Sequence, residues 1–286
     1  MLRSRLDSSA AMPLEELHAA LAQTSGVSVR AGELLSGHTP LRVGGPADLW
    51  AEVEDAEALN EVLRLARKSK VSWRVHWPLE DCLVRDAGFR GLIIRPGVGF
   101  EGAGRRGEGR VWLGAASPWA ALTPLTLLTL TRWPGTVGGL FAAGEQDRLK
   151  GLGLTLRWQK GRRGIVHQVA PGEDVPSLKP TEILTELELD EEMPKRRRLK
   201  PPPGPGRIFS TPKSTDAGEL LLRAGVCGAR LRDWRLTPAE PGTVVHTGTG
   251  SCRDIMLLVR GVTERVQRAR GVKLSLRIPV FGERTP

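Results

Sequence analysis

Three cysteines and five histidines are the side chains of this chain that could hold a metal ion or act as nucleophile and base. They are Cys82, Cys227, Cys252, His18, His38, His76, His167 and His246. The cysteines are odd in number and far apart, which argues against a disulfide framework and predicts ordinary thiols in a reducing compartment. The histidines show no metal-ligand spacing and no clear cysteine partner. We therefore expect structural or surface roles for these residues and predict no metal site.

The chain is basic, with a formal net charge of +10 over 286 residues. Such an excess attracts nucleic acid, anionic membranes or phosphorylated ligands. Part of it lies in the run 195–200, which leads into the proline-rich segment 201–206. We favour a solvated connector with a stiff spacer over a nucleic-acid patch, since tyrosine is absent and phenylalanine is rare. No apolar run matches a membrane span and no secretory signal follows Met1, so we expect a cytoplasmic protein.

Hydrophobic periodicity predicts the elements that would position any site. Helices are expected over 14–23, 56–68, 217–224 and 254–270, and strands at 49–53, 71–76, 92–95, 111–115, 154–159, 183–189, 244–247 and 274–280. Asp55 and Ser251 are expected to cap two of these helices. We also interpret the apolar, threonine-rich segment 119–130 as a buried helix, despite Pro124. A composition break near 194–206 separates a larger N-terminal part from a smaller α+β lobe.

Five segments carry landmarks in a fixed order. They are 38–48 (HTPLRVGGPAD), 83–91 (LVRDAGFRG), 134–139 (PGTVGG), 201–212 and 260–272. In order and spacing they resemble the UDP-N-acetylenolpyruvoylglucosamine reductase family, also called UDP-N-acetylmuramate dehydrogenase or MurB. The resemblance runs from about His38 to Gly282. It implies hydride transfer from NADPH to FAD and then to an enolpyruvyl ether on a UDP-sugar, in a reaction that serves peptidoglycan and cell-wall synthesis.

The resemblance also implies the architecture. We expect an α+β fold in which an FAD-binding-like domain of two α+β subdomains precedes a smaller substrate-domain-like lobe. The expected boundaries are 1–30 for an N-terminal extension, 31–193 for the FAD-binding-like domain with its subdomains at about 31–98 and 99–193, 194–206 for the basic connector, and 207–286 for the C-terminal lobe.

The pyrophosphate loop of the family is not preserved. Its Gly-Gly-Gly-Ser-Asn pattern, whose backbone N–H groups approach the phosphates, aligns with the segment from Trp77 to Asp81. Pro78 removes a backbone N–H donor, and Glu80 and Asp81 bring negative charge. At a carboxylate–phosphate distance of ~5 Å and an effective dielectric of ~20, each carboxylate would repel a phosphate by on the order of 3 kcal/mol. We expect a plain loop here.

The family's second glycine turn is preserved at residues 134–139. By resemblance, Gly135, Thr136, Gly138 and Gly139 are candidate cofactor-binding residues. Two interpretations stay open: the turn approaches a flavin, or it persists because the backbone needs it for packing. The polar Asn that the family shows just beyond is missing from Ala142-Ala143-Gly144, and the family's Tyr-Arg-x-Ser segment has no counterpart before Thr181.

The acid groups of the family are replaced. Arg207 takes the place of its serine proton donor, and Arg277 aligns with its supporting glutamate. Arginine stays protonated and cannot serve as an acid near neutral pH, so no catalytic residue is retained. Two guanidinium groups could still hold an anion, and Ser210 is a displaced donor candidate that points elsewhere.

Two hypotheses follow for the function. The first is a non-catalytic or strongly impaired MurB-like protein, a pseudoenzyme that binds a partner protein or an anionic ligand such as a UDP-sugar, with FAD binding weak or absent. The second is a working FAD-dependent, NADPH-using UDP-N-acetylmuramate dehydrogenase with relocated contacts. We prefer the first, because a fold does not carry function when its site residues are gone.

Overall fold

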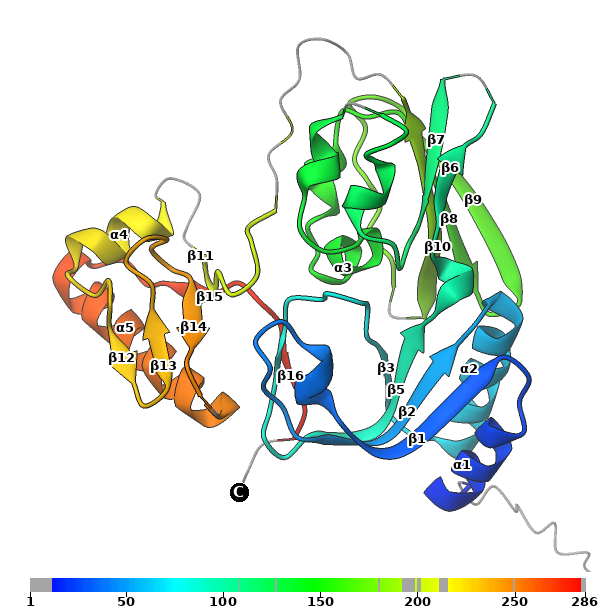
Figure 1. Cartoon of the computed structure of the whole chain (residues 1–286), viewed down its shortest axis with the longest axis horizontal. Helices are drawn as coiled ribbons and strands as arrows, with labels where there is room; N and C mark the ends of the chain where they lie inside the picture. The colour runs from blue at the N-terminus through cyan, green and yellow to red at the C-terminus, as the bar shows by residue number, and fades with distance from the viewer. Residues whose placement is uncertain are drawn as a thin grey trace, which may run out of the picture.

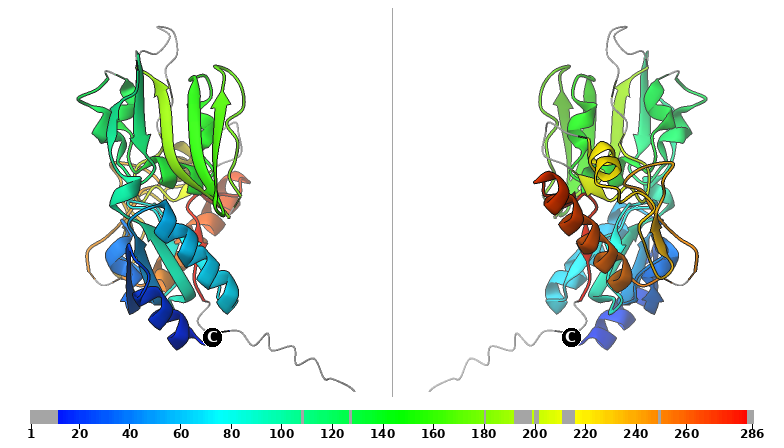
Figure 2. Two further views of the ribbon diagram at one scale, coloured as in Figure 1. Left: turned by 90° about the vertical axis from the view of Figure 1, so that its right-hand side faces the viewer. Right: turned by 90° about the vertical axis from the view of Figure 1, so that its left-hand side faces the viewer.

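The structure is a computed structural model that describes residues 12–107, 109–126, 128–179, 181–191, 199, 202–210, 216–248 and 250–283. Its elements form two α+β subdomains and a C-terminal lobe (Figure 1). Figure 2 shows the second subdomain stacked on the first, with the lobe against one side of the pair. The α+β architecture expected from the sequence is confirmed. The basic run 195–198, with Lys200 and Pro201, lies outside the described residues.

The first subdomain is a mixed sheet covered by two helices. Its elements are α1 (Leu14–Ala22), β1 (Val27–Leu34), η1 (Leu35–His38), β2 (Pro46–Val53), α2 (Ala56–Ser69), β3 (Trp73–Val75), β4 (Leu83–Val84) and β5 (Phe89–Pro96). The strand order is β1-β2-β5-β3, with β1 antiparallel to β2 and both other pairs parallel. The Asp55 carboxylate caps α2 as expected, accepting from the backbone N–H groups of Glu57 and Ala58 at 2.9 Å.

The expected N-terminal extension contributes to this core. Leu17 and Leu21 of α1 are fully buried in the same hydrophobic cluster as the inner face of α2. Strand β1 is absent from our sequence prediction. Its first half alternates, with Val27 and Val29 packed against the core, but none of its residues is fully buried.

The second subdomain is an antiparallel sheet with short helices on one face. Its elements are η2 (Val98–Phe100), β6 (Ala103–Arg105), β7 (Arg110–Gly114), η3 (Trp119–Leu122), η4 (Thr129–Arg132), α3 (Val137–Ala142), η5 (Gln146–Leu149), β8 (Leu154–Lys160), β9 (Arg163–Val169) and β10 (Glu182–Asp190), and the strand order is β6-β7-β10-β8-β9. The buried helix expected over 119–130 is wrong. The segment forms two separate 3₁₀ turns instead, because Pro124 has no N–H to donate and its ring clashes with a preceding helical turn.

The C-terminal lobe packs two helices against short strands. Its elements are β11 (Phe209–Ser210), α4 (Ala217–Arg223), β12 (Arg230–Leu231), β13 (Trp234–Leu236), β14 (Val244–His246), α5 (Cys252–Arg270), β15 (Ser275–Leu276) and β16 (Val280–Phe281). The single strand expected over 274–280 is wrong. β15 pairs with β11 inside the lobe, whereas β16 leaves it and pairs in parallel with β4 of the first subdomain.

A second contact joins the lobe to the first subdomain. The Asp86 carboxylate accepts hydrogen bonds from the backbone N–H groups of Cys252 at 2.7 Å and Arg253 at 2.9 Å, at the start of α5. Ser251 caps the same helix through Asp254 N, as expected. A carboxylate at a helix N-terminus satisfies unpaired N–H groups and complements the helix dipole.

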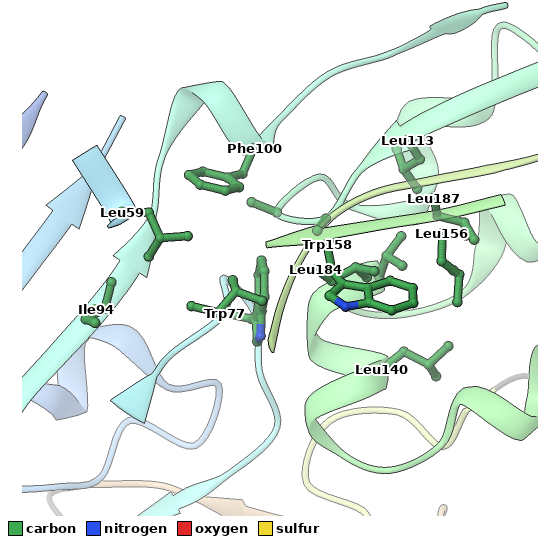
Figure 3. Packing of buried hydrophobic residues seen from close by; sticks show 14 of the residues in the cluster. Leu59, Trp77, Ile94, Phe100, Leu113, Leu140, Leu156, Trp158, Leu184 and Leu187 are labelled. Atoms are coloured by element: carbon green, nitrogen blue, oxygen red, sulfur yellow. The ribbon is translucent and has the colours of Figure 1, made fainter. Parts of the chain in front are cut away.

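The two subdomains share one hydrophobic core. Figure 3 shows Trp77 standing between Leu59 and Ile94 of the first subdomain and Leu184 and Trp158 of the second. The loop after β3 is therefore part of the packing between the subdomains. Among the described helices, none is long and apolar enough to cross a membrane.

Candidate functional site

The candidate site lies where the loop 77–81 meets the glycine turn 134–139. The loop is a tight turn in which Trp77 O accepts from Glu80 N at 3.1 Å and Leu79 adopts a left-handed φ of 57°. Thr136 Oγ1 donates to Pro78 O at 3.3 Å. A β-carbon added at Gly135 would lie 3.7 Å from Leu79 O. The two loops are thus in direct contact.

The indole of Trp77 is seated on the glycine turn. A β-carbon added at Gly138 would lie 2.2 Å from Trp77 Cδ2, which is far below van der Waals contact. The indole is only 5% exposed. This packing therefore requires glycine at position 138. It supports the interpretation that the turn is preserved because the backbone needs it for packing.

Three backbone donors at the start of α3, those of Gly138, Gly139 and Leu140, are already used. Gly138 N donates to Ala115 O at 2.8 Å, and Gly139 N donates to the N-cap oxygen Thr136 Oγ1 at 3.1 Å. Leu140 N donates to Thr136 O at 3.0 Å, as in any helix. The four residues expected to bind a cofactor, Gly135, Thr136, Gly138 and Gly139, do come together. The N–H groups of Gly138 and Gly139 and the hydroxyl of Thr136 bond to the chain itself.

Glu80 turns its carboxylate into the first subdomain. It is 2% exposed, forms an ion pair with Arg74, and accepts from Trp77 N at 3.1 Å. Burial by itself would raise the pKa of Glu80, but the contact with His76 and the positive charge of Arg74 outweigh it and lower that pKa. Glu80 is therefore an ionised and compensated carboxylate.

Arg277 joins all three parts of the molecule. Its guanidinium donates to Asp81 Oδ2 at 2.5 Å in the first subdomain and to Glu145 Oε1 at 3.3 Å in the second, and its Nε donates to Arg207 O at 2.6 Å within the lobe. Gly206 N adds a bond to Asp81 Oδ1 at 3.3 Å. We call Arg277, Asp81 and Glu145 the interdomain clamp.

These pairs correct our expectation of charge repulsion at this loop. Arg74 compensates Glu80 and Arg277 compensates Asp81, so neither carboxylate presents a free negative charge to an approaching anion. The expected pair of anion-holding arginines is likewise wrong for Arg277, whose guanidinium is taken by carboxylates. Arg207 points toward Asp216, with 3.4 Å between Nη2 and Oδ2, and Ser210 Oγ donates to Ser275 O at 3.4 Å.

Two cavities flank the contact between the loops. The smaller, about 50 Å³, lies between the loops and the interdomain clamp. The larger, about 590 Å³, lies on the other side of Trp77 and is lined by Trp73, Phe89, Phe281, Arg74 and Lys179, among others. The smaller cavity is too small for a nucleotide, since pockets for such ligands are typically about 300–1,000 Å³.

Sequence reasoning missed several residues of this site. Glu145 was not considered because its partner lies 132 residues away. Arg74 and His76 stand at the polar positions of the alternating segment 71–76, which the sequence assigns to the outer face of a strand, although His76 is buried. The free thiol of Cys82 is fully buried beside the loop.

Comparison with known proteins places this site in a family context. Residues 199–281 match the family model of the UDP-N-acetylenolpyruvoylglucosamine reductase C-terminal domain. The chain is 28% identical to UDP-N-acetylenolpyruvoylglucosamine reductase 2 of Symbiobacterium thermophilum, over 89% of this chain and 92% of the relative. It is 24% identical to the reductase of Anoxybacillus flavithermus, over 95% and 100%. Over most of its length, the chain is thus similar to MurB reductases. The crystal structure of MurB from Thermus caldophilus shares its fold, with a TM-score of 0.64, 24% identity, and coverage of 90% of this chain and 100% of that one.

The similarity to MurB implies FAD. The phosphates of FAD would need free N–H groups and an open loop, whereas Trp77 and Pro78 contact the turn and the N–H groups of Gly138 and Gly139 are bonded within the chain. The site of this MurB-like chain therefore does not fit a dinucleotide diphosphate in the conformation observed.

Proposed function

We propose that this MurB-like protein is a non-catalytic homologue that has kept the reductase scaffold and binds a partner or an anionic ligand. The observation that carries the proposal is the indole of Trp77 seated on Gly138, where an added β-carbon would lie 2.2 Å from the ring. Opening this contact for a diphosphate would expose a large aromatic side chain that joins the two subdomains. FAD binding is accordingly proposed to be weak or absent.

The replaced acid groups support the same proposal. Reducing an enolpyruvyl double bond requires a proton for the carbon that does not receive hydride, and a positioned acid typically contributes ~10²–10⁴ in rate. Arg207 and Arg277 stand at the family's acid positions, and both remain protonated near neutral pH. Arg277 is moreover fixed by the interdomain clamp.

The larger cavity offers a place for an anionic ligand. Trp73, Phe89 and Phe281 present aromatic surface, and Lys179 supplies positive charge. A ring that carries a phosphate or carboxylate would suit this combination. The cytoplasmic location that we expect from the sequence stays part of this proposal.

A second candidate is the reductase activity itself. The relatives bear that name, and the alignments cover most of both chains. If this candidate holds, FAD and NADPH are the cofactors and the loop 77–81 must open to admit the flavin.

The two candidates are separated by cofactor content and turnover. We expect the purified protein to release no stoichiometric flavin on denaturation, and to oxidise no NADPH when FAD and the enolpyruvyl UDP-sugar are added. The Thermus caldophilus relative serves as positive control. Stoichiometric flavin, or turnover within tenfold of that control, would overturn the proposal in favour of the reductase. The binding of an anionic ligand is tested separately, by titrating a UDP-sugar into the wild-type protein and into the variant Lys179→Ala and comparing the two affinities.

A further inference from the structure

A buried cluster of three metal-ligating side chains lies beside the loop 77–81. His76, Glu80 and Cys82 are each at most 2% exposed, and one ligand atom from each lies within 4.8 Å of the others. Neither the reductase reaction nor the interdomain clamp uses these three groups together. From the sequence we considered only histidines and cysteines as ligands and so did not group these three residues, since one of them is a carboxylate.

The orientation of His76 is the observation that points to a ligand. Its Nε2 lies 3.0 Å from the carbonyl oxygen of His38, which can only accept, so Nε2 carries the proton. Within the described part of the chain, Nδ1 finds no hydrogen-bond partner and faces Glu80 Oε2 at 3.5 Å. A buried ring nitrogen without a hydrogen-bond partner therefore faces a buried carboxylate. Either a proton or a metal ion between the two groups would satisfy both.

We propose that His76 Nδ1, the Glu80 carboxylate and Cys82 Sγ bind one divalent cation of the zinc class. A nitrogen, oxygen and sulfur set suits Zn²⁺, and a metal-bound histidine commonly donates its other N–H to a backbone carbonyl, as His76 does. At zinc bond lengths of about 2.0–2.3 Å, tetrahedral ligand atoms lie about 3.3–3.7 Å apart. His76 Nδ1 and Glu80 Oε2, at 3.5 Å, already lie at such a separation, and the other two pairs must close by at most about 1 Å.

The surrounding charges set the conditions for binding. Arg74 is paired with Glu80 and disfavours a cation, while the thiolate of Cys82 favours one. Burial, followed by the negative charge of Glu80, raises the pKa of the Cys82 thiol. A metal ion at this position would bind the deprotonated thiol. The competing occupant is a proton on Nδ1, which would make His76 an imidazolium paired with Glu80.

The experiment uses the untagged full-length chain after treatment with a chelator. Titration with Zn²⁺ against a chromophoric chelator is expected to show about one tight equivalent per chain. Titration with Co²⁺ is expected to give the charge-transfer band of a cobalt thiolate. Cys82→Ser should abolish that band and weaken zinc binding at least about 100-fold. Cys252→Ser is the matched control, because Cys252 is also buried but lies outside the cluster, and it should leave both results unchanged.

The wild-type spectrum alone decides the proposal if Cys82→Ser fails to fold. A wild-type chain without the cobalt–thiolate band, or with the band intact in Cys82→Ser, would show that the cluster holds only a proton. His76→Gln provides an independent check, since it should weaken zinc binding while keeping the band. None of these readouts involves flavin or NADPH, so they stand apart from the test of the proposed function.

Discussion

The interdomain clamp gives the most direct energetic prediction. Arg277→Met keeps most of the side-chain volume but removes the charge that compensates Asp81 and Glu145. The Arg277, Asp81 and Glu145 side chains are 13%, 17% and 15% exposed, so the pairs are largely but not fully desolvated. Removing one partner of a buried pair typically costs about 3–5 kcal/mol.

The contacts around Arg277 lower the expected loss of unfolding free energy below about 3–5 kcal/mol. Asp81 keeps its bond from Gly206 N, and Glu145 keeps a bond from Arg148 Nε at 2.8 Å. Because each carboxylate retains one donor and some contact with water, we expect Arg277→Met to lower the free energy of unfolding by about 2–3 kcal/mol. Adding Asp81→Asn and Glu145→Gln removes the uncompensated charges, and should recover at least half of the loss.

Urea unfolding followed by tryptophan fluorescence measures the effect. The matched control is Arg260→Met, since Arg260 and its partner Glu264 are 76% and 55% exposed, and this change should stay within about 0.5 kcal/mol of wild type. A loss of under 0.5 kcal/mol for Arg277→Met, or no recovery in the triple variant, would refute the assignment of the clamp as a compensated interdomain contact.

Three further predictions concern the loop and its neighbours. Gly138→Ala should destabilise the protein by about 2–4 kcal/mol, because the added methyl group clashes with Trp77. The control is Gly261→Ala, in open space on α5, which should be neutral or stabilise the protein by up to about 1 kcal/mol. Thermal melts compare the two variants. The lowered pKa of Glu80 means that its contribution to stability is present above its ordinary value of 4.5 and is lost as pH falls through and below it, so Glu80→Gln should flatten the acid limb of the stability–pH curve. Asp86→Ala removes acceptors at the start of α5 and should cost about 1–2 kcal/mol in urea unfolding, an expectation that an unchanged midpoint would contradict.

Many helices and strands of the fold can be predicted from local sequence patterns. The helix 56–68 was predicted almost to its ends, because an aspartate cap and a 3.6-residue apolar stripe are properties of neighbouring residues. The segment 119–130 was mistaken for a helix because its apolar content outweighed Pro124 in our interpretation. Strand β9 was missed because most of its residues are exposed and show no alternation.

The site was only partly predictable for a related reason. The motif comparison located the loop 77–81 and the positions of Arg207 and Arg277, but it could not give their partners. Asp81 and Arg277 meet across 196 residues, and no local pattern indicates such a pairing. Without those partners, Asp81 was interpreted as a source of repulsion when it is one half of an ion pair.

The pairing of β16 with β4 has a consequence for the order in which the protein can be completed. Leu83 and Val84 leave the ribosome well before Val280 and Phe281, since about 200 residues lie between them. At a translation rate of about 5–20 residues per second, β4 remains unpaired for roughly 10–40 s before β16 is made. During that interval the Asp86 carboxylate also lacks the α5 donors that it binds in the finished protein. The first subdomain is thus completed by a strand made about 200 residues later, and a chain interrupted before that strand leaves β4 unpaired.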